Sequence, residues 1–238
     1  MSFKQTAFRW TAALLLTAGS TVASANNYYY YKYYSQFEYE VTITNITRGQ
    51  TFTPQMVVTH NPDVQLFELG SPASSELEVL VEAGDTGPAT ELLSNLPEVS
   101  EVKTIPGLLG PGESISTTIT TNIFRHPVIS MAAMLIPTND TFVALNSVPL
   151  PRRGTISRHL KAYDAGTELN DQNCANMPGP RCGGEGSSAF SETDEGYVYI
   201  GNGFHEIGDN DVAGNEILGP LVYDWRNPVA KITIRRIR

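Results

Sequence analysis

The chain has 238 residues and a formal charge of -9 at pH 7, with 25 acidic residues against 16 lysines and arginines. This surplus of carboxylates argues against a nucleic-acid partner, which needs clustered basic residues, and disfavours simple adsorption to anionic lipid. The length suits one β-rich domain with a hydrophobic core of its own.

The first 25 residues are typical of a secretory signal peptide. Lys4 and Arg9 supply a positive start, residues 11–22 are mostly small and apolar, and residues 23–25 read Ala-Ser-Ala, a small-residue cleavage pattern. The alternative, a membrane anchor, would need a longer apolar run. Cleavage after Ala25 removes two positive charges and shifts the formal charge from -9 to -11. We predict a secreted, periplasmic or cell-surface protein with no transmembrane segment after cleavage.

A tyrosine-rich leader follows at residues 26–36, with tyrosine at every position from 28 to 34 except Lys32. It is either a loose terminus, an adhesive arm or the start of an aromatic strand. The predicted organisation is therefore a signal peptide at 1–25, this leader at 26–36, and one domain at 37–238.

The domain reads as a series of strands. Phe37, Tyr39, Val41 and Ile43 alternate with polar residues, which is the pattern of a half-buried strand. The run 128–136 is nearly all apolar, as in a strand buried on both faces. Further strands are expected at 52–59, 114–122, 142–146, 156–162, 196–200 and 229–237.

Two short helices are expected between these strands. Ser74 is a good N-cap for a helix through Ala83, with Gly84 after its end, and Pro88 suits the first turn of a second helix at 89–96. Many short strands separated by turns favour an all-β, antiparallel β-sandwich with two peripheral helices over a parallel α/β fold.

Cys174 and Cys182 are the two cysteines of the chain. In an exported protein, two cysteines eight residues apart are expected to form a disulfide. The segment between them has no core-forming pattern, so we expect the bridge to constrain a surface loop without contributing to the core.

Two acidic loops carry the clearest functional signal. Residues 137–142 read Pro-Thr-Asn-Asp-Thr-Phe, and residues 163–168 read Tyr-Asp-Ala-Gly-Thr-Glu. Each adjoins a strand-like run, so loops meeting at one end of a sandwich would form an oxygen-lined pocket for a hard cation such as Ca²⁺. The alternative is that these acids cap turns and face solvent. Residues 209–216 form a further acidic stretch without complete EF-hand spacing, and we interpret both it and Asp194-Glu195 as ordinary solvated residues.

The order of these segments resembles the spondin domain, a module of extracellular matrix proteins and bacterial exported proteins. The resemblance runs from about Tyr39 to His205. It begins with the strand at 39–45 and is most specific at 130–145 and 163–168. It implies a sandwich akin to the C2 type, with calcium bound by loops at one end.

The resemblance also implies the ligands, because the acidic positions of the family fall on Asp140, Asp164 and Glu168. Glu168 stands where the family has Asp, which keeps a carboxylate but adds a methylene group. Phe142 stands where a tryptophan is frequent. With Gly166 between them, Asp164 and Glu168 are placed to return to one point through a tight turn.

The function expected from these features is a non-enzymatic, calcium-binding adhesion or protein-interaction module, with an extracellular or cell-envelope protein or a glycan as its ligand. Two alternatives remain, a secreted hydrolase that acts on polysaccharide through paired carboxylates, and a structural surface protein without metal. The sequence has no Gly-x-Ser-x-Gly motif and no zinc-type histidine spacing.

Overall fold

The computed structural model describes residues 36–184, 186 and 194–238. The predicted signal peptide and almost all of the tyrosine-rich leader lie outside the described residues, so both stay predictions. No helix in the described part is long and apolar enough to span a bilayer.

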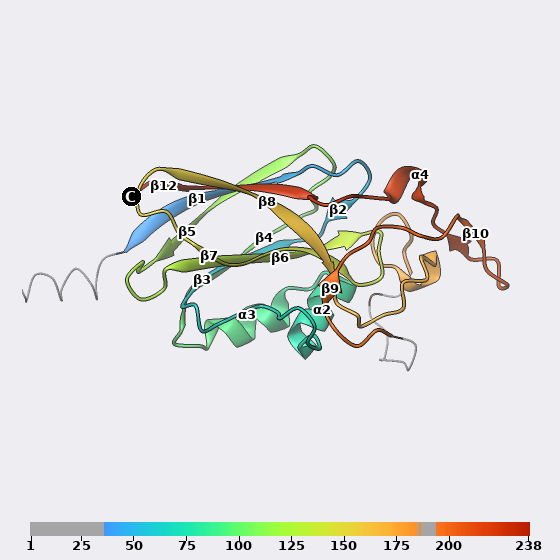
Figure 1. Cartoon of the computed structure of the whole chain (residues 1–238), viewed down its shortest axis with the longest axis horizontal. Helices are drawn as coiled ribbons and strands as arrows, with labels where there is room; N and C mark the ends of the chain where they lie inside the picture. The colour runs from blue at the N-terminus through green and yellow to red at the C-terminus, as the bar shows by residue number, and fades with distance from the viewer. Residues whose placement is uncertain (1–35, 185, 187–193) are drawn as a thin grey trace, which may run out of the picture. The chain divides into compact units, whose positions relative to one another are not determined.

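The described chain folds into an all-β sandwich, as predicted, built from one antiparallel sheet that turns back over itself (Figure 1). The strand order is β4-β3-β6-β7-β8-β12-β1-β5, with β2 on β6 and β9 on β8. The strands are β1 (Phe37–Asn45), β2 (Thr51–Phe52), β3 (Gln55–His60), β4 (Val99–Ile105), β5 (Ser114–Thr121), β6 (Val128–Ile136), β7 (Thr141–Pro149), β8 (Thr155–Asp164), β9 (Tyr199–Ile200), and β12 (Ala230–Arg236).

Strand β8 belongs to both layers of the sandwich. Its first part, residues 155–160, pairs with β12, and its last part, residues 161–164, pairs with β7. Figure 1 shows β12, β1 and β5 in one layer and β7, β6, β3 and β4 in the other. The last residue of β8, Asp164, therefore lies in the second layer, paired with the first residue of β7.

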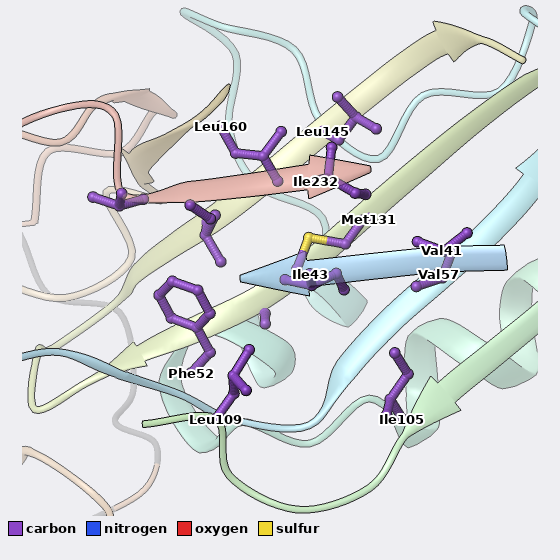
Figure 2. Packing of buried hydrophobic residues seen from close by; sticks show 14 of the residues in the cluster. Val41, Ile43, Phe52, Val57, Ile105, Leu109, Met131, Leu145, Leu160 and Ile232 are labelled. Atoms are coloured by element: carbon purple, nitrogen blue, oxygen red, sulfur yellow. The ribbon is translucent and has the colours of Figure 1, made fainter. Parts of the chain in front are cut away.

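The core between the layers follows from strand alternation. Tyr39, Val41 and Ile43 are fully buried, as their spacing predicts. Figure 2 shows Val41 and Ile43 in one cluster with Ile232 of the neighbouring strand β12 and Met131 of the opposite layer. All nine residues of β6 are buried, because its second face is covered by helices. Burial on both faces explains its almost continuous apolar sequence.

Helices α2 (Ser75–Ala83) and α3 (Gly87–Ser94) cover the outer face of the layer that contains β3 and β6 (Figure 1). The side chain of Ser74 accepts a hydrogen bond from the backbone N–H of Leu77 at 3.3 Å, and Gly84 ends α2 in the left-handed conformation, with φ of 69°. The helix boundaries thus match the predicted cap and breaker residues.

Some elements differ from the prediction. The expected strand at 52–59 is split into β2 and β3 around Thr53-Pro54, where proline cannot donate to the ladder. Strand β4 was not expected, because its apolar residues Val99, Val102 and Ile105 recur every three residues instead of every two. Three small elements were also not predicted: the hairpin of β10 (Asp209–Asn210) and β11 (Glu216–Ile217), the 3-10 helix η1 (Cys174–Asn176), and α4 (Pro220–Tyr223).

The predicted disulfide is present between Cys174 and Cys182, whose Cα atoms are 4.8 Å apart. The expectation that its loop stays out of the core is wrong. Met177, inside the ring, is fully buried in the core between the layers, and both cysteines pack against that core. A single flexible methionine can fill a gap without any regular apolar pattern in its segment, which is why the sequence did not reveal it.

Helix α2 provides the first test. Leu80 is fully buried under the sheet, so Leu80→Ala should lower the free energy of unfolding by about 2–5 kcal/mol. Leu92 on α3 is 46% exposed, and Leu92→Ala is the matched control, with a smaller expected loss. Urea unfolding followed by circular dichroism measures both. Equal losses would contradict the described packing of α2.

Candidate functional site

The register between β7 and β8 brings the two acidic loops together. Thr141, the first residue of β7, is paired with Asp164, the last residue of β8. Asp140 directly precedes Thr141, so its side chain begins one residue from this pair. The two loops are adjacent because β7 begins where its antiparallel partner β8 ends.

Asp140 also holds the second loop in place. Its Oδ2 accepts hydrogen bonds from the backbone N–H of Thr167 at 2.7 Å and of Glu168 at 3.2 Å. The Oδ1 of Asp164 accepts from the N–H of Gly166 at 3.0 Å. Hydrogen bonds to carboxylates therefore hold both ends of this turn: Asp164 accepts at its start, and Asp140 accepts at its end.

Gly166 is required for this turn. Its φ of +67° lies in the left-handed region, and a Cβ atom there would approach the carbonyl oxygen of Tyr197 to 2.4 Å. The N–H of Gly196 donates to the carbonyl of Gly166 at 2.8 Å, so the turn is pressed against a third segment. The tight turn predicted from Gly166 is confirmed.

The three predicted acids are all buried. The exposed fractions of Asp140, Asp164 and Glu168 are 0%, 3% and 5%. Burial, followed by the charge of Asp164, raises the pKa of Asp140 well above its ordinary value, and Glu168 acts in the same direction. The alternative that these acids face solvent is therefore wrong for the described structure.

Two of these carboxylates, those of Asp140 and Asp164, are buried without a basic side chain as an ion-pair partner in the described part of the chain. Asp164 Oδ2 accepts from the side-chain amide of Asn170 at 2.8 Å, whereas Asp140 Oδ1 is buried with no hydrogen-bond partner in the described chain. A buried carboxylate oxygen without a partner is costly, and a bound cation is one way to satisfy it.

The side chains are not arranged as a complete metal cage. Within residues 36–184, 186 and 194–238, no group of three or more histidine, cysteine, aspartate or glutamate side chains is positioned to hold a metal ion. The oxygens of Asp164 and one oxygen of Asp140 are engaged in the hydrogen bonds of the loops. A cation bound by all three acids would therefore require these side chains to exchange some internal hydrogen bonds for metal bonds.

Glu195 is a fourth acid, which the sequence interpretation missed. Its Oε1 accepts from the hydroxyl of Tyr199 at 3.3 Å, and that hydroxyl accepts from Asn170 at 3.0 Å. Burial is the main cause of the raised pKa of Asp164, and the charge of Glu195 contributes to it. The pairing of β9 with β8, which places Tyr199 opposite Asp164, brings this segment to the site. Asp194 and Glu195 are two adjacent acids in a polar stretch, and their local sequence does not indicate that Glu195 lies beside Asp164.

Three aromatic side chains pack together next to the two acidic loops. The rings of Phe142 and Tyr163, which are paired across β7 and β8, have centroids 5.7 Å apart. Phe67 packs on both, with centroid separations of 5.2 Å from Phe142 and 4.8 Å from Tyr163. Phe142, where the family often has tryptophan, thus belongs to a buried aromatic cluster two residues beyond Asp140.

The acidic stretch at 209–216 serves a local purpose. Asp211 accepts hydrogen bonds from the backbone N–H groups of Ala213 and Asn215 and from the side-chain amides of Asn173 and Asn215. These bonds, led by the side chain of Asn215, lower the pKa of Asp211 to about 2. The stretch is a capped β10–β11 hairpin, in agreement with its interpretation as a solvated loop.

Comparison with known protein families agrees with this architecture. The model of the Spondin_N family matches residues 29–173, more than half of the chain. The chain belongs to the spondin domain family. No curated protein matches it. The matched span of this spondin domain contains Asp140, Asp164 and Glu168 but ends before Cys174 and Glu195, so the disulfide and the fourth acid lie in the part beyond the family match.

Membership places the chain among extracellular modules that are generally non-enzymatic and serve protein interactions. The recognition based on the segments at 130–145 and 163–168 is therefore confirmed. The likeness to the C2 type of sandwich and the assignment of the acids as calcium ligands stay predictions.

Gly166 offers a matched pair of substitutions. Gly166→Ala should destabilise the domain by more than Gly154→Ala, although both glycines have positive φ. The backbone strain costs about 1–2 kcal/mol at either position, and a Cβ at residue 154 meets nothing within 4 Å, whereas a Cβ at residue 166 meets the Tyr197 carbonyl. Chemical unfolding measures the difference, and equal losses would show that the turn has room for a side chain.

A second test uses pH in calcium-free buffer. Because the folded-state pKa of Asp140 is raised above its ordinary 3.8, the folded protein binds more protons than the unfolded chain between these two values. The contribution of Asp140 to stability is therefore favourable at low pH and is lost as the pH rises through this window. In the Asp140→Asn variant the side chain does not titrate, and the repulsion between the carboxylates of residues 140 and 164 is removed.

The melting temperature of Asp140→Asn, minus that of the wild type, should therefore increase as the pH rises from about 4 to 7. Asp63→Asn, which alters an exposed acid far along the chain, serves as the control. A difference that is independent of pH would show that Asp140 is not held in an environment that disfavours its charge.

Proposed function

We propose that this chain is an exported, non-enzymatic spondin-type interaction module whose end loops bind Ca²⁺. Asp140, Asp164 and Glu168 would hold the ion. Export to the periplasm, the cell surface or the medium agrees with the signal-peptide pattern at residues 1–25 and with the extracellular character of spondin domains.

The observation that carries the proposal is the unpartnered, buried Oδ1 of Asp140, next to the charge of Asp164. Two neighbouring buried carboxylates repel each other, and in the described residues neither has an ion pair with lysine or arginine. A divalent cation would satisfy the open oxygen and reverse the repulsion. Ca²⁺ takes six to eight oxygen ligands in flexible geometry, which suits carboxylates on loops better than the strict octahedron of Mg²⁺ does.

Three carboxylates around a divalent ion leave a net charge of -1, and the remaining coordination positions would be filled by carbonyl oxygens and water. Glu168 is longer by a methylene group than the aspartate of the family pattern. Its N–H is already fixed by Asp140, so the extra length has to be taken up by the side chain. Bound calcium would mainly fix the two loops relative to each other and so shape the interaction surface at this end of the sandwich.

A binding role is favoured over hydrolysis because the family is generally non-enzymatic and because both oxygens of Asp164 are occupied in loop hydrogen bonds. A hydrolase would need one carboxyl group free to protonate a leaving group and another free to activate water or attack.

Calorimetric titration with Ca²⁺ tests the proposal. We expect the full chain to bind one ion with an affinity typical of extracellular modules, a Kd of about 0.1–1 mM. Asp164→Asn should weaken binding by about tenfold or more, because it removes one charged ligand. Glu168→Asp, which restores the family residue, should keep binding.

Asp211→Asn is the matched control, since Asp211 is an acidic turn residue in the β10–β11 hairpin and should leave calcium binding unchanged. Circular dichroism and unfolding confirm that each variant is folded. Absence of binding by the wild type at several millimolar Ca²⁺, or equal effects of Asp164→Asn and Asp211→Asn, would overturn the metal assignment.

A further inference from the structure

Asn139 and Asp171 form a second link between the two acidic loops. The side-chain amide of Asn139, which directly precedes Asp140, donates to Oδ1 of Asp171 at 3.0 Å. This bond runs from the first loop to the segment that follows the second loop. In the opposite direction, the backbone N–H groups of Thr167 and Glu168 in the second loop donate to Asp140 in the first. The two loops are therefore joined at two points, each time through a carboxylate.

The two links differ in their relation to the proposed ion. The link through Asp140 uses a carboxylate that the ion would also engage, so metal binding and the loop hydrogen bonds compete for the same group. The link between Asn139 and Asp171 uses none of the three proposed ligands. Asn139 is 2% exposed, so water has little access to replace its amide bond. This second link is therefore the one that can hold the loops adjacent while an ion binds.

Asp171 is itself held in place by neighbouring groups. Its Oδ1 also accepts from the backbone N–H of Asn173 at 2.9 Å, and its Oδ2 accepts from the side-chain amide of Asn176 at 2.6 Å. Asn176 is the last residue of η1 and lies inside the ring closed by Cys174 and Cys182. The disulfide-closed ring therefore supplies one of the anchors of this carboxylate.

The next residue, Gln172, fixes the backbone at Asp171. It is in the left-handed conformation with φ of 54°, although it is not glycine. Its side-chain Oε1 accepts from the backbone N–H groups of His205 and Glu206 at 2.7 and 2.8 Å, and its Nε2 donates to the carbonyl of Leu218. A residue with a side chain keeps this conformation only where its surroundings determine it. Contacts to the C-terminal part of the chain therefore hold the segment that carries Asp171.

We propose that Asp171 is a positioning residue of the calcium site, which acts through Asn139 to hold the loop of Asp140 against the loop of Glu168. The inference rests on the proposed calcium binding and adds to it the group that pre-organises the loops. Ligands that are already adjacent lose less conformational freedom when the ion binds, so the link raises the affinity. Both oxygens of Asp171 already accept from N–H groups, which suits a positioning residue better than a further ligand.

The anchors of Asp171 lie beyond the span that the family model matches. That span ends at residue 173, so it contains Asn139 and Asp171 but not Asn176, His205 or Leu218. The C-terminal part of this chain, including its disulfide ring, thereby acquires a role in the site formed by the matched part.

Calorimetric titration of the full chain with Ca²⁺ tests the proposal through a double-mutant cycle. Asp171→Ala and Asn139→Ala each remove the link, and each should weaken calcium binding by about three- to tenfold, the effect of losing one hydrogen bond. The double variant should bind no more weakly than Asp171→Ala alone, because both substitutions remove the same bond. Asp85→Ala is the matched control: it removes an exposed carboxylate that accepts from the N–H of Gly87, away from the acidic loops, and should leave the Kd unchanged.

Asp171→Asn separates positioning from charge. Asparagine keeps an oxygen that accepts from Asn139 but removes the negative charge, so its calcium affinity should stay close to that of the wild type. A ligand or a purely electrostatic role would instead make Asp171→Asn bind as weakly as Asp171→Ala. Thermal unfolding with and without Ca²⁺ supplies a second readout: the rise in melting temperature that calcium causes should be smaller in Asp171→Ala than in the wild type.

The outcomes distinguish this inference from the proposed function. If the wild type binds calcium and folded Asp171→Ala binds it equally well, the positioning role is wrong and the calcium assignment stands. Equal weakening by Asp171→Asn and Asp171→Ala, or effects of Asp171→Ala and Asn139→Ala that multiply in the double variant, would refute the positioning role in the same way. Absence of calcium binding by the wild type would remove the calcium assignment and this inference together.

Discussion

The strand β8 is the element on which the rest of the structure depends. It pairs with β12 along its first part and with β7 along its last part, and in this way it joins the two layers of the sandwich. The same crossing sets the position of Asp164 opposite Thr141. A shift of one residue in this register would turn Asp164 to the other face of the sheet and separate it from the loop that carries Asp140.

This arrangement is energetically unfavourable in one respect, because it buries several carboxylates close together. Asp140, Asp164 and Glu168 are buried together, and Glu195 adds its field from a segment that pairs with the end of β8. Backbone N–H groups and amides offset part of that charge but leave Asp140 Oδ1 without a partner in the described chain. A buried polar atom without a partner needs an explanation, and a bound ion is the one on which the proposal of cation binding rests.

Asp164 lies at the boundary between the proposed calcium loops and a polar cavity. On one side of Asp164 lie the acids and the tight turn at Gly166, which suit a hard cation. On the other side lies a polar cavity of about 230 Å³ whose lining includes Tyr199, Glu195 and Trp225. An ion bound at the loops would also fix part of the cavity wall, because Asp164 belongs to both.

The sequence by itself determined the class of fold and most of its elements. Alternation at Phe37–Ile43 and the apolar run at 128–136 predict strands, and Ser74 and Gly84 predict the limits of a helix, because these signals depend on local backbone geometry. The order of short segments was enough to identify the spondin family and to select Asp140, Asp164 and Glu168 among many acids.

Tertiary structure decided what local patterns cannot encode. The burial of Asp140, the backbone N–H groups from which it accepts, and the presence of Glu195 and Trp225 in one cavity all depend on contacts between residues far apart in the chain. The burial of Met177, in the loop closed by the disulfide, likewise depends on contacts distant in sequence. Burial and electrostatic coupling are properties of the packed arrangement, whereas periodicity and capping are properties of neighbouring residues, and only the latter can be read along the chain.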